Sequence, residues 1–327
     1  MHRWKCLILA SVYLLTCFGC GADKKSVTDD APETVRGRVA VTNYPLFCMA
    51  SSICRDESGP VKELIYVGPP NGADAHSWMP STSQIRDLQN VDLIVCNGHG
   101  AVFANWMDKV TINQSKLCET TEGIKLSEFV IVKDYQLVHS HGPEGEHSHS
   151  WIVSQSWLSP KIARKQATLM FKRLVTVYGE SHQLDNGFAE LQKQFDQLEA
   201  AAEKIQSDHP DHVVTSSTPD IQYLTRNLGW TDHYLQWTEP RSAAQGEKEI
   251  ADMRARIANE GSKPSQTESL FLWSGAPVEG VTAIVDAQWP ANVTIDLIDS
   301  PGSDDIDPNG YFERMASNLD RIGSSLE

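Results

Sequence analysis

The sequence lacks any long apolar run after residue 20, so no later segment is suited to cross a bilayer. Positive charge is also scarce, because 28 Lys and Arg residues stand against 43 Asp and Glu, for a net charge of −15. This balance argues against a nucleic-acid-binding protein and suits one that handles cations. Gly-x-Ser-x-Gly, phosphate-binding glycine motifs and His-Glu-x-x-His are missing as well. The sequence therefore does not favour an enzyme.

The N-terminus has the features of an export signal. Residues 1–20 begin with positive charge, continue into a short apolar core and end at Cys20. The pair Gly19-Cys20 resembles a bacterial lipobox, in which the cysteine is lipidated and becomes the first mature residue. Residues 21–37 are polar and lack an apolar period, as expected of a flexible tether. We expect an extracytoplasmic protein anchored to the membrane by a lipid on Cys20, with plain secretion as the alternative.

Four cysteines follow the signal, namely Cys48, Cys54, Cys96 and Cys118. An even number in an exported protein suggests disulfides, although four cysteines allow three pairings that the sequence does not distinguish. Metal-binding thiolates are the competing interpretation. No Cys-x-x-Cys spacing among these four supports it.

Short apolar strands alternate with helices along the chain, which is typical of parallel α/β architecture. In the first half the pattern predicts strands at 38–44, 63–67 and 91–96, and helices at 46–54, 81–88 and 103–109. After residue 209 the alternation restarts, with strands predicted at 212–215, 268–273, 281–285 and 293–298, and helices at 220–227, 246–259 and 312–322. The sequence therefore predicts two similar α/β lobes.

Two helices separate these halves. Ser159-Pro160 supplies an N-cap and a first-turn proline for a helix that runs through Tyr178. Apolar residues then recur at intervals of three and four from Leu184 to Ile205, which predicts an amphipathic helix of about 25 residues that ends before His209. We therefore divide the mature chain into an N-terminal lobe, one long rigid interlobe helix and a C-terminal lobe, at 38–180, 181–208 and 209–327.

The run His139-Ser-His-Gly-Pro-Glu-Gly-Glu-His-Ser-His149 contains four imidazoles and two carboxylates. Imidazole nitrogen is the commonest protein ligand for zinc and related ions, and carboxylates complete such sites. The glycines and the proline of this run oppose a helix, so we predict a loop that folds around an ion. Within each His-Ser-His pair the two imidazoles share one face if the backbone is extended. A solvated polar loop is the alternative.

Three further sequence motifs follow one another along the chain. Residues 72–98 contain Gly72-Ala-Asp-Ala-His76, then Pro80-Ser and Leu88-Gln-Asn-Val-Asp-Leu93 before the buried strand. Trp157-Leu-Ser-Pro160 and the 184–205 stripe follow. Together they resemble the metal-binding solute receptors of ABC transporters, the zinc- and manganese-uptake family, whose zinc-specific members carry a histidine-rich acidic loop near position 140. The resemblance implies two α/β lobes joined by a rigid helix, with a metal ion in the cleft between them.

The resemblance also implies ligands. The family usually holds its ion with three histidines and one carboxylate, and here the first histidine matches His76 and the carboxylate matches Asp299. The two remaining positions are Gln155 and Thr218, so the usual set is incomplete. Zinc needs four donors at about 2.0–2.3 Å, and a flexible loop can supply them. We predict that loop imidazoles join the site, whose candidates are then His76, His139, His141, His147, His149 and Asp299; weak binding, or another ligand in the cleft, is the alternative.

The favoured function is capture of a divalent metal ion for uptake through an ABC permease and its ATPase. The nitrogen-rich loop favours Zn²⁺ over Mn²⁺ as the transported ion. We expect a monomer that contacts the membrane through its lipid anchor and does not bind nucleic acid. The alternatives are a zinc-buffering or adhesin-type surface lipoprotein without a transport role and a zinc-dependent hydrolase. A hydrolase would need an open coordination position beside an oriented general base, which no motif provides.

Overall fold

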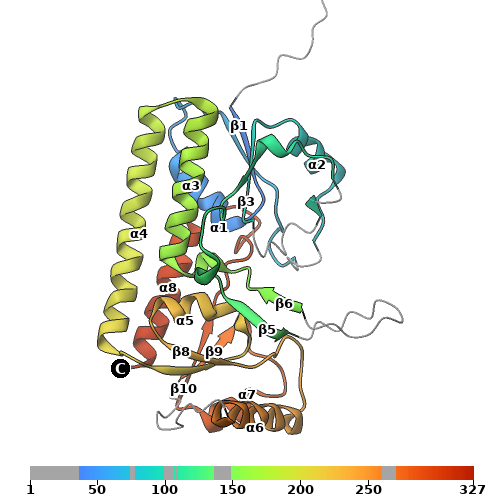
Figure 1. The fold of residues 1–327 in the computed structure, drawn as a ribbon, viewed down its shortest axis with the longest axis vertical. Coiled ribbons are helices and arrows are strands. Elements are labelled where there is room, and N and C mark those ends of the chain that lie inside the picture. The colour runs from blue at the N-terminus through green and yellow to red at the C-terminus, as the bar shows by residue number, and fades with distance from the viewer. Residues whose placement is uncertain (1–36, 74–77, 99–105, 108–109, 136–148, 260–269) are drawn as a thin grey trace, which may run out of the picture. The chain divides into compact units, whose positions relative to one another are not determined.

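The N-terminal lobe is built on a four-stranded parallel sheet. The structure is a computed structural model that describes residues 37–73, 78–98, 106–107, 110–135, 149–259 and 270–327. The first sheet has the order β2-β1-β3-β4 and consists of β1 (Arg38–Val41), β2 (Glu63–Tyr66), β3 (Leu93–Cys96) and β4 (Leu117–Glu119). Helices α1 (Tyr44–Ile53) and α2 (Thr82–Gln89) belong to this lobe (Figure 1). Every residue of β3 is buried, as expected of a strand covered on both faces.

The C-terminal lobe repeats this topology. Its parallel sheet has the order β10-β9-β7-β8 and consists of β7 (Val213–Ser216), β8 (Thr231–Tyr234), β9 (Leu270–Ser274) and β10 (Ala291–Ile295). In both sheets the second strand in sequence lies beside the first, and the third and fourth follow on the other side. The associated helices are α5 (Gln222–Asn227), α6 (Ala243–Asn259) and α7 (Thr282–Gln288). The two predicted similar α/β lobes are therefore confirmed.

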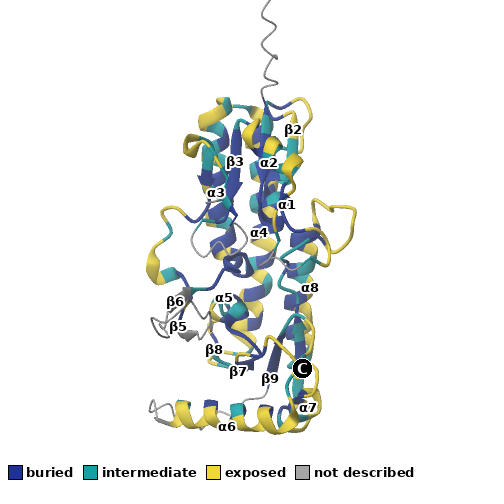
Figure 2. Ribbon diagram, turned by 90° about the vertical axis from the view of Figure 1, so that its right-hand side faces the viewer, coloured by how far each residue is buried: buried dark blue, intermediate teal, exposed yellow. Residues whose placement is uncertain are grey.

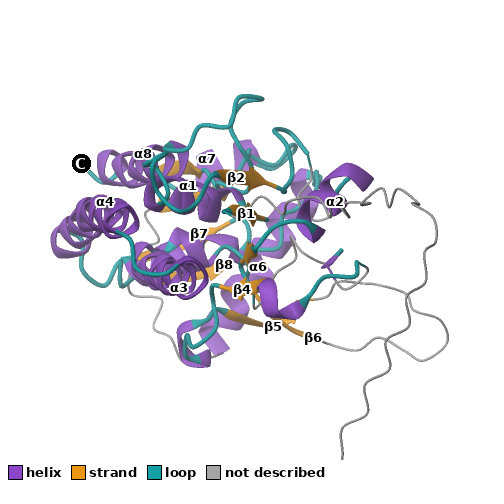
Figure 3. Cartoon of the chain, turned by 90° about the horizontal axis from the view of Figure 1, so that it is seen from above, coloured by secondary structure: helices purple, strands orange, loops and turns teal. Residues whose placement is uncertain are grey.

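Three long helices run beside the sheets. These are α3 (Pro160–Tyr178), α4 (His182–Asp208) and α8 (Gly310–Ser325). Seen from above, they lie together on one side of the strands, with α2 on the other (Figure 3). Helix α4 packs on α1 of the N-terminal lobe, on α3, and on α8, which in turn covers β10 of the C-terminal lobe. Within the described ranges, no helix has the length and apolar character needed to span a membrane.

One hydrophobic cluster extends through both lobes along α4. It includes Val39 and Leu93 from the first sheet and Leu270 and Ile295 from the second. On α4 itself, the fully buried Phe195 packs edge-to-face on Phe312 of α8, with ring centroids 5.3 Å apart. Buried residues follow the strands and the inward faces of the helices, whereas α6 is exposed along much of its length (Figure 2). The lobes therefore share a core.

Short elements connect the main ones. A two-stranded antiparallel ladder is formed by β5 (Ile131–Tyr135) and β6 (His149–Ile152), which pair Tyr135 with His149. The single-turn 3-10 helices are η3 (Gln114–Lys116), η4 (Leu126–Glu128), η6 (Ser156–Leu158) and η7 (Pro219–Ile221). The predicted histidine loop falls between β5 and β6, and residues 136–148 lie outside the described residues.

Two expectations about local structure need correction. Residues 281–285 were predicted as a strand, but Val281 is the N-cap of α7 and residues 282–285 form its first turn, so that Val281 and Val285 are both fully buried one helical turn apart. A short apolar run fits either periodicity, and here the fourth-residue spacing decides. Strand β8 was not predicted, because Thr231-Asp-His-Tyr234 is polar and largely half-buried. The helix predicted at 103–109 falls almost wholly outside the described residues.

The disulfides suggested by the even cysteine count are wrong, because Cys48, Cys54, Cys96 and Cys118 are free thiols. In the β3–β4 ladder Cys118 pairs with Val95, so Cys96 and Cys118 project from opposite faces of the sheet. Burial raises the pKa of Cys48 to about 11 and those of the other three to about 12. The thiols are thus neutral core groups.

Gly187 sets the close approach of α4 to α1. A Cβ at this position would lie 2.2 Å from the carbonyl oxygen of Ile53 and 2.7 Å from that of Ser52. Alanine favours a helix over glycine by about 1 kcal/mol, yet we predict that Gly187→Ala lowers the free energy of unfolding by about 1–3 kcal/mol through overpacking. Urea unfolding followed by circular dichroism measures the change.

The matched control is Gly323→Ala in α8, where the nearest atom to the added Cβ is Ile205 Cγ1 at 3.9 Å. This contact is ordinary, so the helix-propensity gain should persist and stability should stay equal or rise by up to about 1 kcal/mol. Equal stabilisation by both substitutions would contradict the close helix contact.

Candidate metal site

Asp299 is the predicted ligand whose side chain the structure describes. His76, His139, His141 and His147 lie outside the described residues, as does the predicted lipidation site Cys20. His149 opens β6, but its side chain is likewise outside the description. The ligand set therefore stays a prediction, and the described part of the site begins at Asp299.

The described groups follow the ends of strands, two of them in the parallel sheet of the C-terminal lobe. Asp299 follows β10, Thr218 follows β7, and Gln155 follows the β5–β6 ladder. Tyr66, which ends β2 in the other lobe, is also within electrostatic reach of Asp299. Ligand sites of open α/β sheets lie beyond these strand ends. The fold thus brings residues that are far apart in the sequence close to Asp299.

Asp299, which is half-buried, and the buried Gln155 have unsatisfied acceptors. Gln155 is 1% exposed, and its amide lowers the pKa of the neighbouring Asp299 carboxyl. The atoms Asp299 Oδ1 and Gln155 Oε1 are buried, and neither has a hydrogen-bond partner among the described residues. A buried acceptor without a partner costs about 1–3 kcal/mol. Two such oxygens in contacting residues fit a bound cation, which takes oxygen donors directly.

The surroundings of Asp299 favour its neutral form until positive charge is added. Burial raises its pKa well above the usual value, and the negative charge of Asp220 raises it next most strongly, followed by that of Asp296. The hydrogen bond from Gln155 and the charge of Arg314 act in the opposite direction but are smaller. A divalent cation would reverse this balance and displace the proton.

Asp220 lies beside the position where the third family histidine was expected. Thr218 occupies that position and is 4% exposed. Its hydroxyl donates to Asp220 Oδ2 at 2.7 Å, and the Asp220 N–H donates back to Thr218 Oγ1 at 3.3 Å. Thr218 thereby caps the turn Pro219–Ile221 and holds the carboxylate against the end of β7. Sequence reasoning missed Asp220; the signal was the Thr-x-Asp spacing of a capped turn directly after a buried strand.

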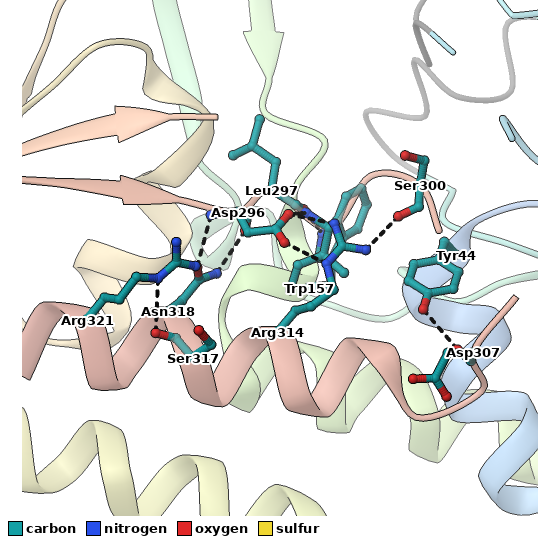
Figure 4. A network of polar contacts seen from close by, with 11 residues as sticks. Tyr44, Trp157, Asp296, Leu297, Ser300, Asp307, Arg314, Ser317, Asn318 and Arg321 are labelled. Carbon is teal, nitrogen blue, oxygen red and sulfur yellow. Dashed lines mark hydrogen bonds and ion pairs between the residues drawn. The ribbon is translucent and has the colours of Figure 1, made fainter. Parts of the chain in front are cut away.

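Arg314 and Asn318 of α8 hold the loop that carries Asp299 (Figure 4). Arg314 makes two hydrogen bonds of 2.6 Å to the Asp296 carboxylate and a third, also 2.6 Å, to the carbonyl of Ser300. Asn318 bonds both the N–H and the C=O of Asp296, at 2.9 and 2.8 Å. Asp299 is therefore fixed from both sides along the chain.

The backbone before Asp299 is strained. Ile298 has φ of 58°, a left-handed conformation that a β-branched residue rarely adopts, and its N–H donates to Asp296 Oδ1 at 2.9 Å. Such a conformation costs about 1–3 kcal/mol and persists only where neighbouring contacts enforce it. Here the Arg314–Asp296 pair enforces it, which aims the next residue, Asp299, into the site.

The N-terminal lobe also holds this loop. Trp157 Nε1 donates to the carbonyl of Leu297 at 2.8 Å, and Tyr311 of α8 donates to the carbonyl of Trp157 at 2.8 Å. Tyr44 of α1 donates to the carbonyl of Asp307 at 2.9 Å (Figure 4). The tryptophan of the Trp-Leu-Ser-Pro motif therefore positions the Asp299 loop.

The described residues do not complete a metal site by themselves. Across the described ranges, no group of three or more His, Cys, Asp or Glu side chains is arranged to hold a metal ion. A metal ion bound near Asp299 would therefore need donors from other segments as well. His76 and the four histidines between residues 139 and 149 remain the candidates for these further donors.

Comparison with known proteins identifies the family. Residues 39–325 match the model of the zinc-uptake complex component A periplasmic family, ZnuA. The chain belongs to this family. The name of the family is that of a component of a zinc-uptake complex. Two relatives of the chain are uptake or substrate-binding proteins and not enzymes.

The relatives within and near this family include zinc and manganese proteins. The high-affinity zinc uptake system protein ZnuA of Bacillus subtilis is 27% identical over 184 residues, which cover 53% of this chain and 52% of that protein. The chain thus matches about half the length of this relative. The manganese ABC transporter substrate-binding lipoprotein PsaA of Streptococcus anginosus is 21% identical over 334 residues, covering 100% of this chain and 99% of that protein.

A solved structure shows the same fold. FpvC of Pseudomonas aeruginosa, in complex with Mn²⁺, aligns with a TM-score of 0.66 at 18% identity, covering 89% of this chain and 98% of that one. At this identity the likeness establishes the two-lobed α/β fold and no more.

The hydrogen bonds of Arg314 to Asp296 and Ser300 give a first test of the site. We predict that Arg314→Lys lowers the free energy of unfolding by about 1–3 kcal/mol, because lysine loses the two-pronged contact with the partly buried Asp296. It should also weaken metal binding, because Asp299 is no longer held. Urea unfolding and metal titration measure the two effects.

Arg321→Lys is the control on the same helix, since Arg321 donates hydrogen bonds to Ser317 and Asn318 of α8 and not to Asp296 itself. Its stability should change by less than about 0.5 kcal/mol. Equal effects of the two substitutions would show that the Asp296 contact does not hold the loop.

Proposed function

We propose that the protein is the extracytoplasmic receptor of an ABC transporter and captures a divalent metal ion, with Zn²⁺ as its main cargo. The observation that carries this proposal is that the buried oxygens Asp299 Oδ1, after β10, and Gln155 Oε1, after β6, have no hydrogen-bond partner among the described residues. Membership of the zinc-uptake family supports it.

The attachment of the β5–β6 ladder to α5 supports a role in the site for the histidine loop between these two strands. Tyr223 of α5 accepts from the N–H of Val130 and donates to the carbonyl of Val153, both at 3.1 Å. Arg226 of the same helix donates to the carbonyl of Phe129 at 3.1 Å. The start of β5 and the end of β6, which together form the end of the ladder opposite Tyr135 and His149, are therefore attached to α5, which begins directly after the turn that carries Asp220. We propose that loop imidazoles replace the family donors missing at Gln155 and Thr218.

The choice of ion follows from the donors. Four loop imidazoles and His76 favour Zn²⁺, whereas the carboxylates also accept Mn²⁺. The zinc and manganese relatives agree with either ion. We therefore propose Zn²⁺ as the main cargo and Mn²⁺ as a second one.

Delivery requires a partner in the membrane. We propose that a lipid on Cys20 anchors the receptor, that residues 21–37 form the tether, and that the monomer docks on a permease driven by its ATPase. A zinc-buffering or adhesin-type lipoprotein is the alternative. Permease and ATPase genes adjacent to this gene would favour transport. Nothing in the described geometry orients a general base, so the hydrolase has no supporting observation.

Metal titration tests the ligand set. We predict that deletion of residues 139–149 and the substitution His76→Ala each weaken Zn²⁺ binding at least about tenfold, because each removes nitrogen donors. The control is His182→Ala, at the exposed first residue of α4, which should bind as the intact chain does. Competition with a chromophoric chelator measures the affinities. Unchanged affinity after loop deletion would refute the loop's role, and no binding by the intact chain would refute metal capture.

Binding should weaken as the pH falls. Imidazoles take up protons below about pH 6.5, and Asp299, whose pKa is raised first by burial, holds its proton more tightly than an ordinary carboxyl. Since the ion competes with these protons, Zn²⁺ affinity should drop at least about tenfold from pH 7.5 to pH 5.5, with proton release on binding. Calorimetry in buffers of different ionisation enthalpy measures both. A pH-independent affinity without proton release would contradict this ligand set.

A further inference from the structure

We propose that Tyr44 is a positioning residue that couples the loop after β10, which carries Asp299, to the loop after β2, which leads to His76. The first loop belongs to the C-terminal lobe and the second to the N-terminal lobe. The inference rests on the proposed function, because it concerns how two donors of that site are brought together. It assigns a role in metal binding to a buried side chain, 1% exposed, that is outside the predicted ligand set.

Tyr44 contacts the C-terminal lobe at two points. The guanidinium of Arg314 lies over its ring, with Cζ 5.6 Å from the ring centroid, a distance at which a cation is attracted to an aromatic face (Figure 4). The Tyr44 hydroxyl donates to the carbonyl of Asp307 at 2.9 Å, just before α8 begins. The same guanidinium donates to the carbonyl of Ser300 at 2.6 Å. Tyr44 therefore packs on the group that holds the residue after Asp299.

Tyr44 also contacts the end of β2 in its own lobe. Its ring meets that of Tyr66 edge to face, with centroids 6.2 Å apart and planes at 77°. Phe47 of α1 packs on Tyr66 in the same manner, at 5.5 Å. Such aromatic pairs are favourable and directional. The Tyr66 hydroxyl donates to the carbonyl of Pro69 at 2.9 Å, so this ring fixes the start of the loop that leads to His76.

Two glycines allow the backbone to approach these tyrosines closely. A Cβ on Gly310, the first residue of α8, would overlap the hydroxyl oxygen of Tyr44. A Cβ on Gly68 would lie 2.5 Å from both Cζ and the hydroxyl oxygen of Tyr66. A larger residue at either position would displace the ring beside it. The sequence therefore provides the space that both ring contacts require.

These contacts form a continuous row between the two loops. Its members, in order, are Ser300, Arg314, Tyr44, Tyr66 and Pro69. All five are buried or half-buried, and none belongs to α4, so the row couples the lobes in addition to their shared core. An ion that takes donors from both loops gains from this coupling, because the ordering of one loop also orders the other.

The test compares Tyr44→Leu and Tyr44→Phe with the intact chain in titrations with Zn²⁺ alone, by competition with a chromophoric chelator. Leucine removes both ring contacts, whereas phenylalanine keeps them and loses only the hydroxyl. We expect Zn²⁺ affinity to fall at least about tenfold in Tyr44→Leu and less than about threefold in Tyr44→Phe. Wild-type affinity of Tyr44→Leu would overturn the inference while leaving metal capture intact. Failure of the intact chain to bind Zn²⁺ would instead overturn the proposed function.

Trp289→Leu is the matched control for a general loss of stability. Trp289 is buried, lies under the Arg254 guanidinium at 5.3 Å and meets Phe271 edge to face at 4.9 Å, so it makes the same two kinds of contact. It precedes β10, at the opposite end of this strand from Asp299. Both leucine variants should unfold at lower urea concentration, but only Tyr44→Leu should bind Zn²⁺ more weakly when folded. Equal losses of affinity would show a merely structural role and overturn the inference.

A double-mutant cycle tests the coupling even if Tyr44→Leu does not fold. Arg314→Lys breaks the row on one side of Tyr44, and Tyr66→Leu breaks it on the other. Sites without shared partners change affinity independently, whereas these two share Tyr44. Once the row is broken at one place, a second break should cost little more. We therefore expect the loss of Zn²⁺ affinity in the double variant to be at least about threefold smaller than the product of the single losses. A loss equal to that product would overturn the inference.

Discussion

The packing of α4 against both lobes is the constraint on which the rest of the structure depends. The helix shares one hydrophobic cluster with both sheets, and Gly187 lets it approach the backbone of α1 closely. Because the core is continuous, the carboxyl ends of the two sheets are held in a defined relation. Donors from different lobes can then meet at one ion without either lobe forming the site alone.

Within this frame, the loop after β10 is held rigidly in an unfavourable conformation. The left-handed Ile298 is enforced by the Arg314–Asp296 pair, by Asn318 and by the indole of Trp157. The cost of this strain and of the unsatisfied Asp299 oxygen is carried by the metal-free fold. If Asp299 binds the ion as we propose, this preorganisation means that little binding energy is lost to ordering of the loop.

Much of the fold could be predicted from the sequence because periodicity reports burial. The stripe from Leu184 to Ile205 matches α4, and the apolar run before Cys96 matches the fully buried β3. The run at 281–285 was misassigned because a short apolar segment suits a strand and a helix equally. Cysteine parity was equally misleading, since strand register places Cys96 and Cys118 on opposite faces.

The site was less predictable, since the residues around Asp299 come from segments that are far apart in the sequence. Asp299 was reached through a family resemblance, and its environment, including Gln155 and Arg314, could not be deduced from local sequence. Asp220 was missed because Thr218-Pro-Asp reads locally as an ordinary capped turn. Its closeness to Asp299 depends on how β7 and β10 are ordered in the sheet, which periodicity does not encode.

The antiparallel pairing of Tyr135 with His149 has a consequence for how this protein family can vary. The ladder closes the base of the intervening segment independently of either parallel sheet. Lengthening such a segment costs only loop-closure entropy, about 0.6 kcal/mol for each doubling. Insertions and deletions between β5 and β6 are therefore expected to cost the fold little stability.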